Sequence, residues 1–274
     1  MRKNGIKEHN DACKVFETYE EKKIDYIFVH YARQNCFEES YEKGPRVITI
    51  TVMNAESEQT LTFSIKKCSE KYGCDFFDLE EKEKDKIEYD MLENFFKYVV
   101  ANKNKTWLHW NMKNNNFGFY AINDRFRELG GVPYDFDENK LVNISDLLKR
   151  KYGTNFATDC VWNGKTMGKM YDIFMLNNIS DSSILNGEQE IKEYILKNIL
   201  AVEQSVIGKL KAFKLIVERA ADNVLVTRGN ILRDVYGFGI SGIAQYIQDN
   251  AILALLFAIF GSIIATIICN TLGI

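Results

Sequence analysis

The sequence predicts a mixed α/β domain followed by a single C-terminal transmembrane helix, and three features lead to this prediction. Three β-branched and aromatic runs lie close together: Ile24–Phe37, Arg46–Met53 and Thr60–Ile65. Segments with helical spacing of apolar residues follow them, as in domains that pack helices on a sheet. The stretch Ala251–Leu272 is apolar throughout, and Asp249 is the last charged residue of the sequence.

Bulk composition limits the classes of function. The 274 residues carry a formal net charge of −3, which argues against a protein that coats nucleic acid, although a local basic pocket remains compatible. The N-terminus is charged throughout and lacks the apolar core of a secretory signal. The six cysteines are scattered without a Cys-x-x-Cys pair or a Cys/His cluster, so we expect neither a disulfide scaffold nor a zinc ribbon. We expect no metal and no cofactor.

The three strand-like runs predict an antiparallel meander. Gly44 and Pro45 precede the second run, and the polar residues 54–59 separate the second from the third. Short polar connections of this kind join neighbouring antiparallel strands.

Further elements follow at the spacing of an α/β domain. The apolar positions of Ile87–Val100 predict a helix, with the charged stretch Asp78–Asp90 leading into it as a solvated face. Thr106–Trp110 reads as a short buried strand, on which Trp107 and Trp110 face opposite sides. Two more predicted helices are Asn116–Leu129 and Ser145–Tyr152, the second ended by Gly153.

One long helix is predicted from Gly187 onwards. An apolar stripe with steps of three and four residues runs through it to Val217. The polar residues that we assign to its other face are Lys192, Glu193, Glu203, Lys209 and Lys211. Packing of the stripe on the sheet is the default, and pairing between subunits is the alternative.

The C-terminal stretch has the length and composition of a bilayer span. A spanning helix needs about 20 mostly apolar residues, and a buried core helix normally shows a charged edge. Arg228 and Arg233 precede the stretch and no basic residue follows it. The positive-inside rule therefore predicts a single-pass protein of the cell inner membrane with its N-terminal domain in the cytoplasm. The alternative is a buried terminal helix.

Small and polar residues recur every four positions along this helix. They are Ala254, Ala258, Ser262, Thr266 and Asn270. Small side chains let helices approach closely, and hydroxyl and amide groups hydrogen-bond across the contact. The stripe predicts a homo-oligomer in the lipid bilayer and a pore-lining face, whereas the plainer interpretation is a passive anchor.

The approach to the membrane is rich in glycine and aromatic residues. We interpret Gly237, Gly239 and Gly242 as hinges of a gating joint or of a flexible linker. Candidates for an interfacial aromatic belt are Tyr236, Phe238 and Tyr246.

The element order strand-strand-strand-helix-strand-helix resembles the ribonuclease H-like fold of DEDD-type 3′–5′ exonucleases. The segment TWLHWNM followed by NFGFYAINDRFRELGG resembles the fourth strand and next helix of that family, and ISDLLKRKYG resembles its following helical segment. The resemblance covers about residues 24–220 and implies a mixed-sheet, ribonuclease H-like domain. We divide the chain into an N-terminal charged segment (1–23), a ribonuclease H-like sensor domain (24–225), a joint (226–250) and the membrane helix (251–274).

The chain lacks the carboxylates with which this family holds its catalytic metals. The family uses an Asp-x-Glu pair on its first strand, because divalent cations need clustered oxygen ligands. Here no carboxylate lies between Tyr26 and Phe37, and His109-Trp110-Asn111 occupies the fourth-strand position. We therefore predict a protein that is not an enzyme. Its nuclease-like cleft would bind a ligand through His30, Arg33, Gln34, His109, Asn111, Lys113 and Arg125.

The combination of such a domain with a membrane helix resembles prokaryotic antiphage membrane effectors. Hailong-type effectors and effectors of cyclic-oligonucleotide signalling are the two versions considered. The resemblance implies that a nucleotide or short single-stranded DNA oligomer controls self-association of the membrane helix. The alternatives are a membrane-anchored, metal-dependent nuclease and a tail-anchored module that binds another protein.

Overall fold

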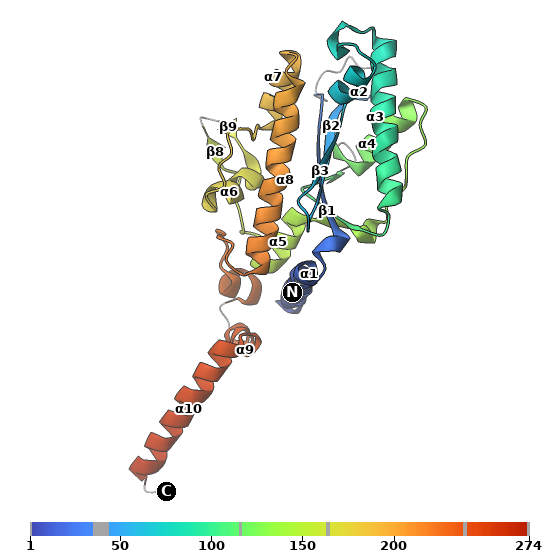
Figure 1. Ribbon diagram of the computed structural model, residues 1–274. Helices are drawn as coiled ribbons and strands as arrows, with labels where there is room; N and C mark the ends of the chain where they lie inside the picture. Colours follow the sequence, from blue (N-terminus) through green and yellow to red (C-terminus); the bar gives the residue numbers. More distant parts are fainter. Residues whose placement is uncertain (1, 35–43, 115–116, 163–164, 238–239, 273–274) are drawn as a thin grey trace.

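The computed structural model describes residues 2–34, 44–114, 117–162, 165–237 and 240–272. A central sheet lies between helices on both of its faces, and a long C-terminal helix extends away from this body (Figure 1).

The central sheet has five strands in the order β3-β2-β1-β4-β7. The first three are antiparallel neighbours, whereas β4 and β7 continue the sheet parallel to β1. Their bounds are β1 (Tyr26–Arg33), β2 (Val47–Asn54), β3 (Thr60–Ser64), β4 (Thr106–His109) and β7 (Leu141–Asn143). The predicted meander and the mixed α/β class are both confirmed. The part of the first predicted run beyond Gln34 lies outside the described residues.

Eight helices of the domain surround this sheet among the residues that the structure describes. They are α1 (Arg2–Glu21), α2 (Ile65–Lys71), α3 (Glu81–Ala101), α4 (Phe119–Glu128), α5 (Ile144–Tyr152), α6 (Gly168–Leu176), α7 (Gly187–Ile195) and α8 (Ile199–Ala221). Two small hairpins, β5 (Lys113–Asn114) with β6 (Phe117–Gly118) and β8 (Val161–Trp162) with β9 (Lys165–Thr166), lie outside the main sheet. Short 3₁₀ turns are η1 (Lys23–Asp25), η2 (Phe76–Asp78) and η3 (Glu138–Lys140).

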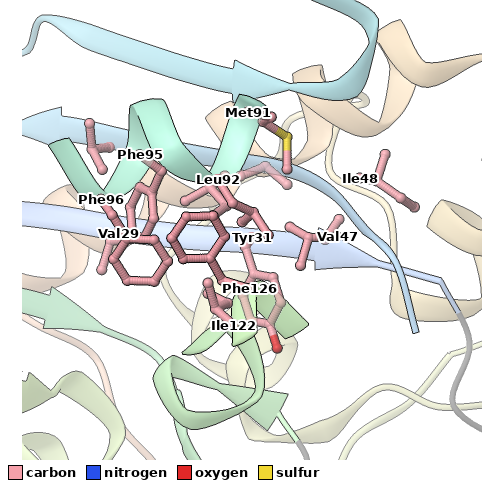
Figure 2. Close-up of a cluster of buried hydrophobic side chains, with 14 of the residues drawn as sticks. Val29, Tyr31, Val47, Ile48, Met91, Leu92, Phe95, Phe96, Ile122 and Phe126 are labelled. Atoms are coloured by element: carbon pink, nitrogen blue, oxygen red, sulfur yellow. The ribbon is translucent and has the colours of Figure 1, made fainter. Parts of the chain in front are cut away.

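Alternation along β1 divides the interior into two cores. Val29 and Tyr31 belong to the core under α3 and α4, where Figure 2 shows them beside Phe95 and Phe96 of α3. The other face of β1 contributes Phe28 to a second core, built with α1, α5 and α8. Successive strand residues point to opposite faces, so His30 lies on the α8 side of the sheet.

The charged N-terminal segment is a helix that packs on the second core. Ala12, Phe16 and Tyr19 of α1 are buried there, at steps of three and four residues. A high content of charged residues between these positions hid the pattern at the level of sequence.

Three predicted helices differ from the structure by more than one residue, and the smallest difference is in α4, which begins at Phe119 because Phe117–Gly118 forms β6. α3 begins at Glu81 rather than Ile87, because Glu80 and Glu83 form a capping box at its start. The long helix predicted from Gly187 is wrong as one element, since it breaks between α7 and α8. Lys197 adopts a positive φ of 62°, and the side chain of Asn198 caps the new helix start.

The C-terminal part consists of a π-helical turn and two helices, η4 (Leu232–Tyr236), α9 (Ile240–Asp249) and α10 (Ala251–Leu272). Among the described residues, no single helix has the length and apolar composition needed to cross a bilayer. Gly242–Asp249 and Ala251–Ile267 meet that requirement only together, as a pair bent by 107°. The single transmembrane helix therefore stays a prediction.

Candidate functional site

A cleft of about 900 Å³ opens at the carboxyl end of β1. It is bounded by that strand end, by the segment after β4, and by residues of α6, α7 and α8. Four of the residues predicted to bind a ligand line it, namely His30, Arg33, Gln34 and Asn111. The prediction that these four share one site therefore agrees with the geometry, whereas their binding role stays a prediction.

A slip in strand pairing positions the first group of cleft residues. The register between β1 and β2 shifts between Ala32 and Arg33, and such a bulge bends a strand and redirects its side chains. Arg33 follows the shift and lies with its guanidinium 5.6 Å from the ring centroid of Phe117. Gln34 is held by its Nε2, which donates to the hydroxyl of Tyr194 at 2.7 Å.

His30 provides a buried nitrogen without a partner. Its side chain lines the cleft, is 6% exposed, and packs edge-on against Phe213 with the ring centroids 5.4 Å apart. Nδ1 has no hydrogen-bond partner among the described residues. Burial, with help from the nearby Lys209, holds the pKa of His30 well below its usual value, so the imidazole is neutral. A buried polar atom of this kind normally has a partner, and a ligand in the cleft would supply one.

Lys209 and Glu190 form a buried ion pair in the wall of the cleft. Lys209 Nζ donates to Glu190 Oε1 at 2.6 Å, and the same oxygen accepts from Ser205 Oγ at 2.7 Å. Lys209 is 3% exposed, so its assignment to the solvated face of a long helix is wrong. An ammonium carries three donors, and within the described residues only Glu190 accepts from it. Donors therefore remain for a bound anion.

Asn111 stands where the parallel strands β4 and β7 end together. It adopts a positive φ of 52°, which asparagine tolerates better than most residues. Asn143 fixes its orientation, because Asn143 Oδ1 accepts from the Asn111 backbone N–H at 3.0 Å and Asn143 Nδ2 donates to Asn111 Oδ1 at 3.1 Å. The adjacent Trp110 also lines the cleft, whereas Trp107 is buried in the core under α3, as the predicted alternation requires.

Residues of α6 complete the cleft and were missed at the level of sequence. Lys169 and Tyr171 line it, and the next residue, Asp172, is fully buried. Asp172 accepts from the Thr158 backbone N–H at 2.9 Å and from the guanidinium of Arg228, which contacts both of its oxygens. Arg228 lowers the pKa of Asp172, so the carboxylate stays charged and ties α6 to the segment that leads to η4.

Arg125 does not reach the cleft, so its assignment to the ligand site is wrong. It is 4% exposed and donates to Glu88 through Nε at 3.0 Å and through Nη2 at 2.7 Å. Arg46 donates to the same carboxylate at 2.8 Å, and Asp85 contacts both guanidiniums. Its charge is therefore matched inside the protein on the α3 side of the sheet.

His109 and Lys113 also lie away from the cleft lining. His109 is fully buried, and its Nδ1 accepts from the Met112 backbone N–H at 3.1 Å. Burial lowers the pKa of His109 to about 3, which keeps it neutral. Lys113 is exposed and donates to the carbonyl of Glu138. Neither residue lines the cleft, so neither belongs to the predicted ligand site there.

Potential metal ligands do not gather in the described part of the chain. No group of three or more His, Cys, Asp or Glu residues there is placed to hold a metal ion. Asp159, Glu188 and Glu190 line the cleft, together with the cations Arg33, Lys169 and Lys209. Carboxylates and cations are thus equal in number along this lining.

Three residues of the predicted small-residue stripe of α10, Ala258, Ser262 and Thr266, are exposed, whereas Ala254 is partly buried. Ser262 Oγ donates to the carbonyl of Ile259 at 2.8 Å, and Thr266 Oγ1 donates to that of Ser262 at 2.9 Å. Both hydroxyls are satisfied within their own helix. Close contact between copies would therefore rest on the small size of Ala258 and its neighbours, while the side chain of Asn270 lies outside the described residues.

Comparison with known proteins gives little guidance. No family model and no curated protein matches the sequence. Among solved structures, the Nibbler EXO domain of Aedes aegypti is similar over 77% of this chain and 92% of its own, with 10% sequence identity and a TM-score of 0.28. A likeness this weak carries no argument about function. The observed mixed sheet with helices on both faces is consistent with the ribonuclease H-like expectation, and the site must be argued from its own geometry.

Proposed function

We propose that this protein is an antiphage defence effector in which a non-catalytic, nuclease-like domain controls a membrane helix. The cleft beside β1 binds a nucleotide or a short single-stranded DNA oligomer. The state of the cleft then governs self-association of α10 in the inner membrane. The observation that carries the proposal is the cleft lining, where Nδ1 of the neutral His30 has no partner among the described residues and the ammonium of Lys209 donates only to Glu190.

The balance of charges in the cleft favours a ligand with both donors and acceptors. Arg33, Lys169 and Lys209 suit phosphate oxygens, whereas Asp159 and Glu188 accept from sugar hydroxyls or base N–H groups. Aromatic side chains beside these groups offer faces for bases. The volume of about 900 Å³ is at the upper end of small-ligand pockets, which suits one or a few nucleotides better than a duplex.

The geometry of α10 supports the membrane part of the proposal. Its 22 residues, at 1.5 Å each, span about 33 Å, close to the thickness of a bilayer core. Large apolar side chains such as Leu255, Phe257 and Phe260 are exposed on it. Arg228 and Arg233 precede it, which favours a cytoplasmic domain. A ligand switches such a system only if it binds one assembly state more tightly.

Ligand binding is tested with the full-length protein in detergent. The probe is a fluorescein-labelled pentathymidine strand, followed by anisotropy, and labelled ATP serves as the mononucleotide. Arg33→Ala is expected to weaken binding about tenfold, the usual effect of one lost charge-assisted contact. Lys113→Ala removes an equally basic but exposed side chain outside the cleft, and it should leave the affinity unchanged.

Three outcomes would overturn this part of the proposal. Equal effects of the two substitutions on affinity would show that the probe does not bind in the cleft. Degradation of the strand with Mg²⁺ or Mn²⁺ would favour the membrane-anchored nuclease. Tight membrane association without binding of either probe would favour a tail-anchored protein-interaction module.

Membrane function is tested by dye release from lipid vesicles that contain the full-length protein. We expect release to change when the bound probe is added or removed. Joint replacement of Ser262, Thr266 and Asn270 by leucine should abolish release while leaving probe binding intact, because leucine fills the close-contact stripe. Unchanged release from that variant contradicts the stripe as the working surface.

A further inference from the structure

Two opposite faces of α9 have different surroundings. Gly242, Tyr246 and Asp249 lie on one face, where the helix contacts the folded domain through Tyr236. Ile240, Ile243, Ala244 and Ile247 follow the i, i+3, i+4, i+7 spacing of a single helical stripe on the other side. Ile240 is 90% exposed and Ile243 is 39% exposed. Within the described chain, no segment packs over this apolar stripe closely enough to remove these two side chains from solvent.

Tyr236 fixes the polar face of α9 to the domain. Its ring lies edge-on against Tyr246, and its hydroxyl donates to Asp249 Oδ2 at 2.9 Å. The same ring contacts His9 of α1, with centroids 5.7 Å apart. A Cβ at Gly242 would lie 2.3 Å from the Tyr236 carbonyl oxygen, so only glycine permits this approach. Tyr236 is 2% exposed, and the prediction that it belongs to an aromatic belt is wrong.

The angle between α9 and α10 agrees with a membrane surface. The bend of 107° differs from a right angle by less than about 20°. Helices that cross a bilayer are usually tilted from its normal by a similar angle, about 20°. If α10 crosses the bilayer, α9 therefore runs almost parallel to the membrane plane. Asp249 and Gln245 hydrogen-bond each other at the bend, and a carboxylate bound to the folded domain is not placed in hydrocarbon.

We infer that α9 is an interfacial helix whose Ile240–Ile243–Ala244–Ile247 stripe lies in the headgroup region of the bilayer, while Tyr236 holds its opposite face to the domain. Amphipathic helices of this kind bury their apolar face about 5–10 Å into the interface. The inference rests on the proposed membrane location of α10 and adds the surface that sets the orientation of the domain on the lipid. The occupant of the stripe is thus lipid rather than a second copy of the chain.

The test measures quenching of tryptophan fluorescence by brominated lipids in vesicles that contain the full-length protein. Ile243→Trp places a probe on the stripe, and the signal of the three native tryptophans is subtracted. Phe260→Trp reports α10 about 14 Å beyond its start, close to the bilayer centre. Val132→Trp is the matched control, because Val132 is an exposed aliphatic residue in the segment after α4.

We expect Ile243→Trp to lose most fluorescence when bromine is near the headgroups, Phe260→Trp when bromine is at the chain ends, and Val132→Trp in neither case. Quenching of Ile243→Trp chiefly by chain-end bromine would show a broken span and overturn the inference. Absence of quenching at 243 with normal quenching at 260 would show that protein covers the stripe, while the membrane helix stands. Absence of quenching at both positions would contradict the proposed membrane location of α10 as well.

Discussion

Two groups of buried polar and charged side chains lie on opposite faces of the same sheet, and they differ in how completely their hydrogen-bonding groups are used. On the α3 side, the closed cluster consists of Arg46, Asp85, Glu88 and Arg125. On the α8 side, the cleft cluster consists of His30, Glu190 and Lys209. Glu88 is fully buried and accepts from both arginines and from the Val47 backbone N–H at 2.7 Å.

The difference distinguishes buried groups that are paired within the protein from buried groups that could still bind a ligand. Burial raises the pKa of Glu88, and the two guanidiniums act against that rise. In the cleft cluster, by contrast, His30 Nδ1 has no partner within the described residues and Lys209 has one acceptor for three donors. Buried polar groups cost free energy unless they are paired, so unpaired groups beside an open cleft point to a ligand.

The largest predicted effect is the loss of Glu88. Glu88→Ala leaves Arg46 and Arg125 buried with less compensating charge, and removal of one partner from a buried ion pair costs about 3–5 kcal/mol. Urea unfolding of the full-length protein in detergent measures this loss. Glu190→Ala is the matched control in the cleft cluster, where the loss should be smaller because one cation rather than two loses its carboxylate partner. Equal losses would mean that the two clusters do not differ in the way described.

A second prediction concerns acid. The pKa of His109 is lowered to about 3 by burial, so the unfolded chain takes up a proton near pH 6.5 that the folded chain does not. The stabilisation by neutral His109 is complete above pH 6.5 and is lost as the pH falls towards 3. Between pH 7 and pH 5 the expected loss is about 2 kcal/mol.

His109→Asn keeps an acceptor for the Met112 backbone N–H and should remove that part of the pH dependence of unfolding. His9 and His30, whose pKa values are also lowered by burial, retain their own share. His30→Asn should likewise flatten the pH profile, but it alone should weaken binding of the nucleotide probe. A pH profile that His109→Asn leaves unchanged contradicts the structural role of this histidine.

The smallest predicted effect is at an exposed ion pair. Lys97 donates to Glu93 at 2.7 Å on α3, and both side chains are well exposed. Lys97→Ala should cost only about 0.3–0.5 kcal/mol, the usual contribution of such a pair on a helix. The same unfolding measurement checks it, and a loss comparable to that of Glu88→Ala would show that burial does not decide the strength of these pairs.

Local pattern accounts for most elements of the sheet. The β-branched runs around Val29, Ile50 and Phe63 predict three neighbouring strands, and the structure contains them. Gly153, with a φ of 89°, ends α5 as expected. Helix limits were less accurate, because the capping box at Glu80 and the positive φ of Lys197 depend on a few residues rather than on periodicity.

The candidate site could be predicted only in part. His30, Arg33 and Gln34 follow one strand and therefore stay together, which sequence order alone indicates. Arg125 and Lys209 both occupy polar positions of apolar-striped helices and look equally solvated in the sequence. Packing buries both, one against Glu88 and one against Glu190.

By itself, the sequence determined the meander of strands and the uncharged C-terminal stretch, because both follow from the order of neighbouring residues. Only the tertiary structure decided which charges are enclosed, which residues of α6, α7 and α8 reach the cleft, and which face of α9 is left exposed. These properties depend on contacts between distant parts of the chain, and periodicity within one element does not contain them.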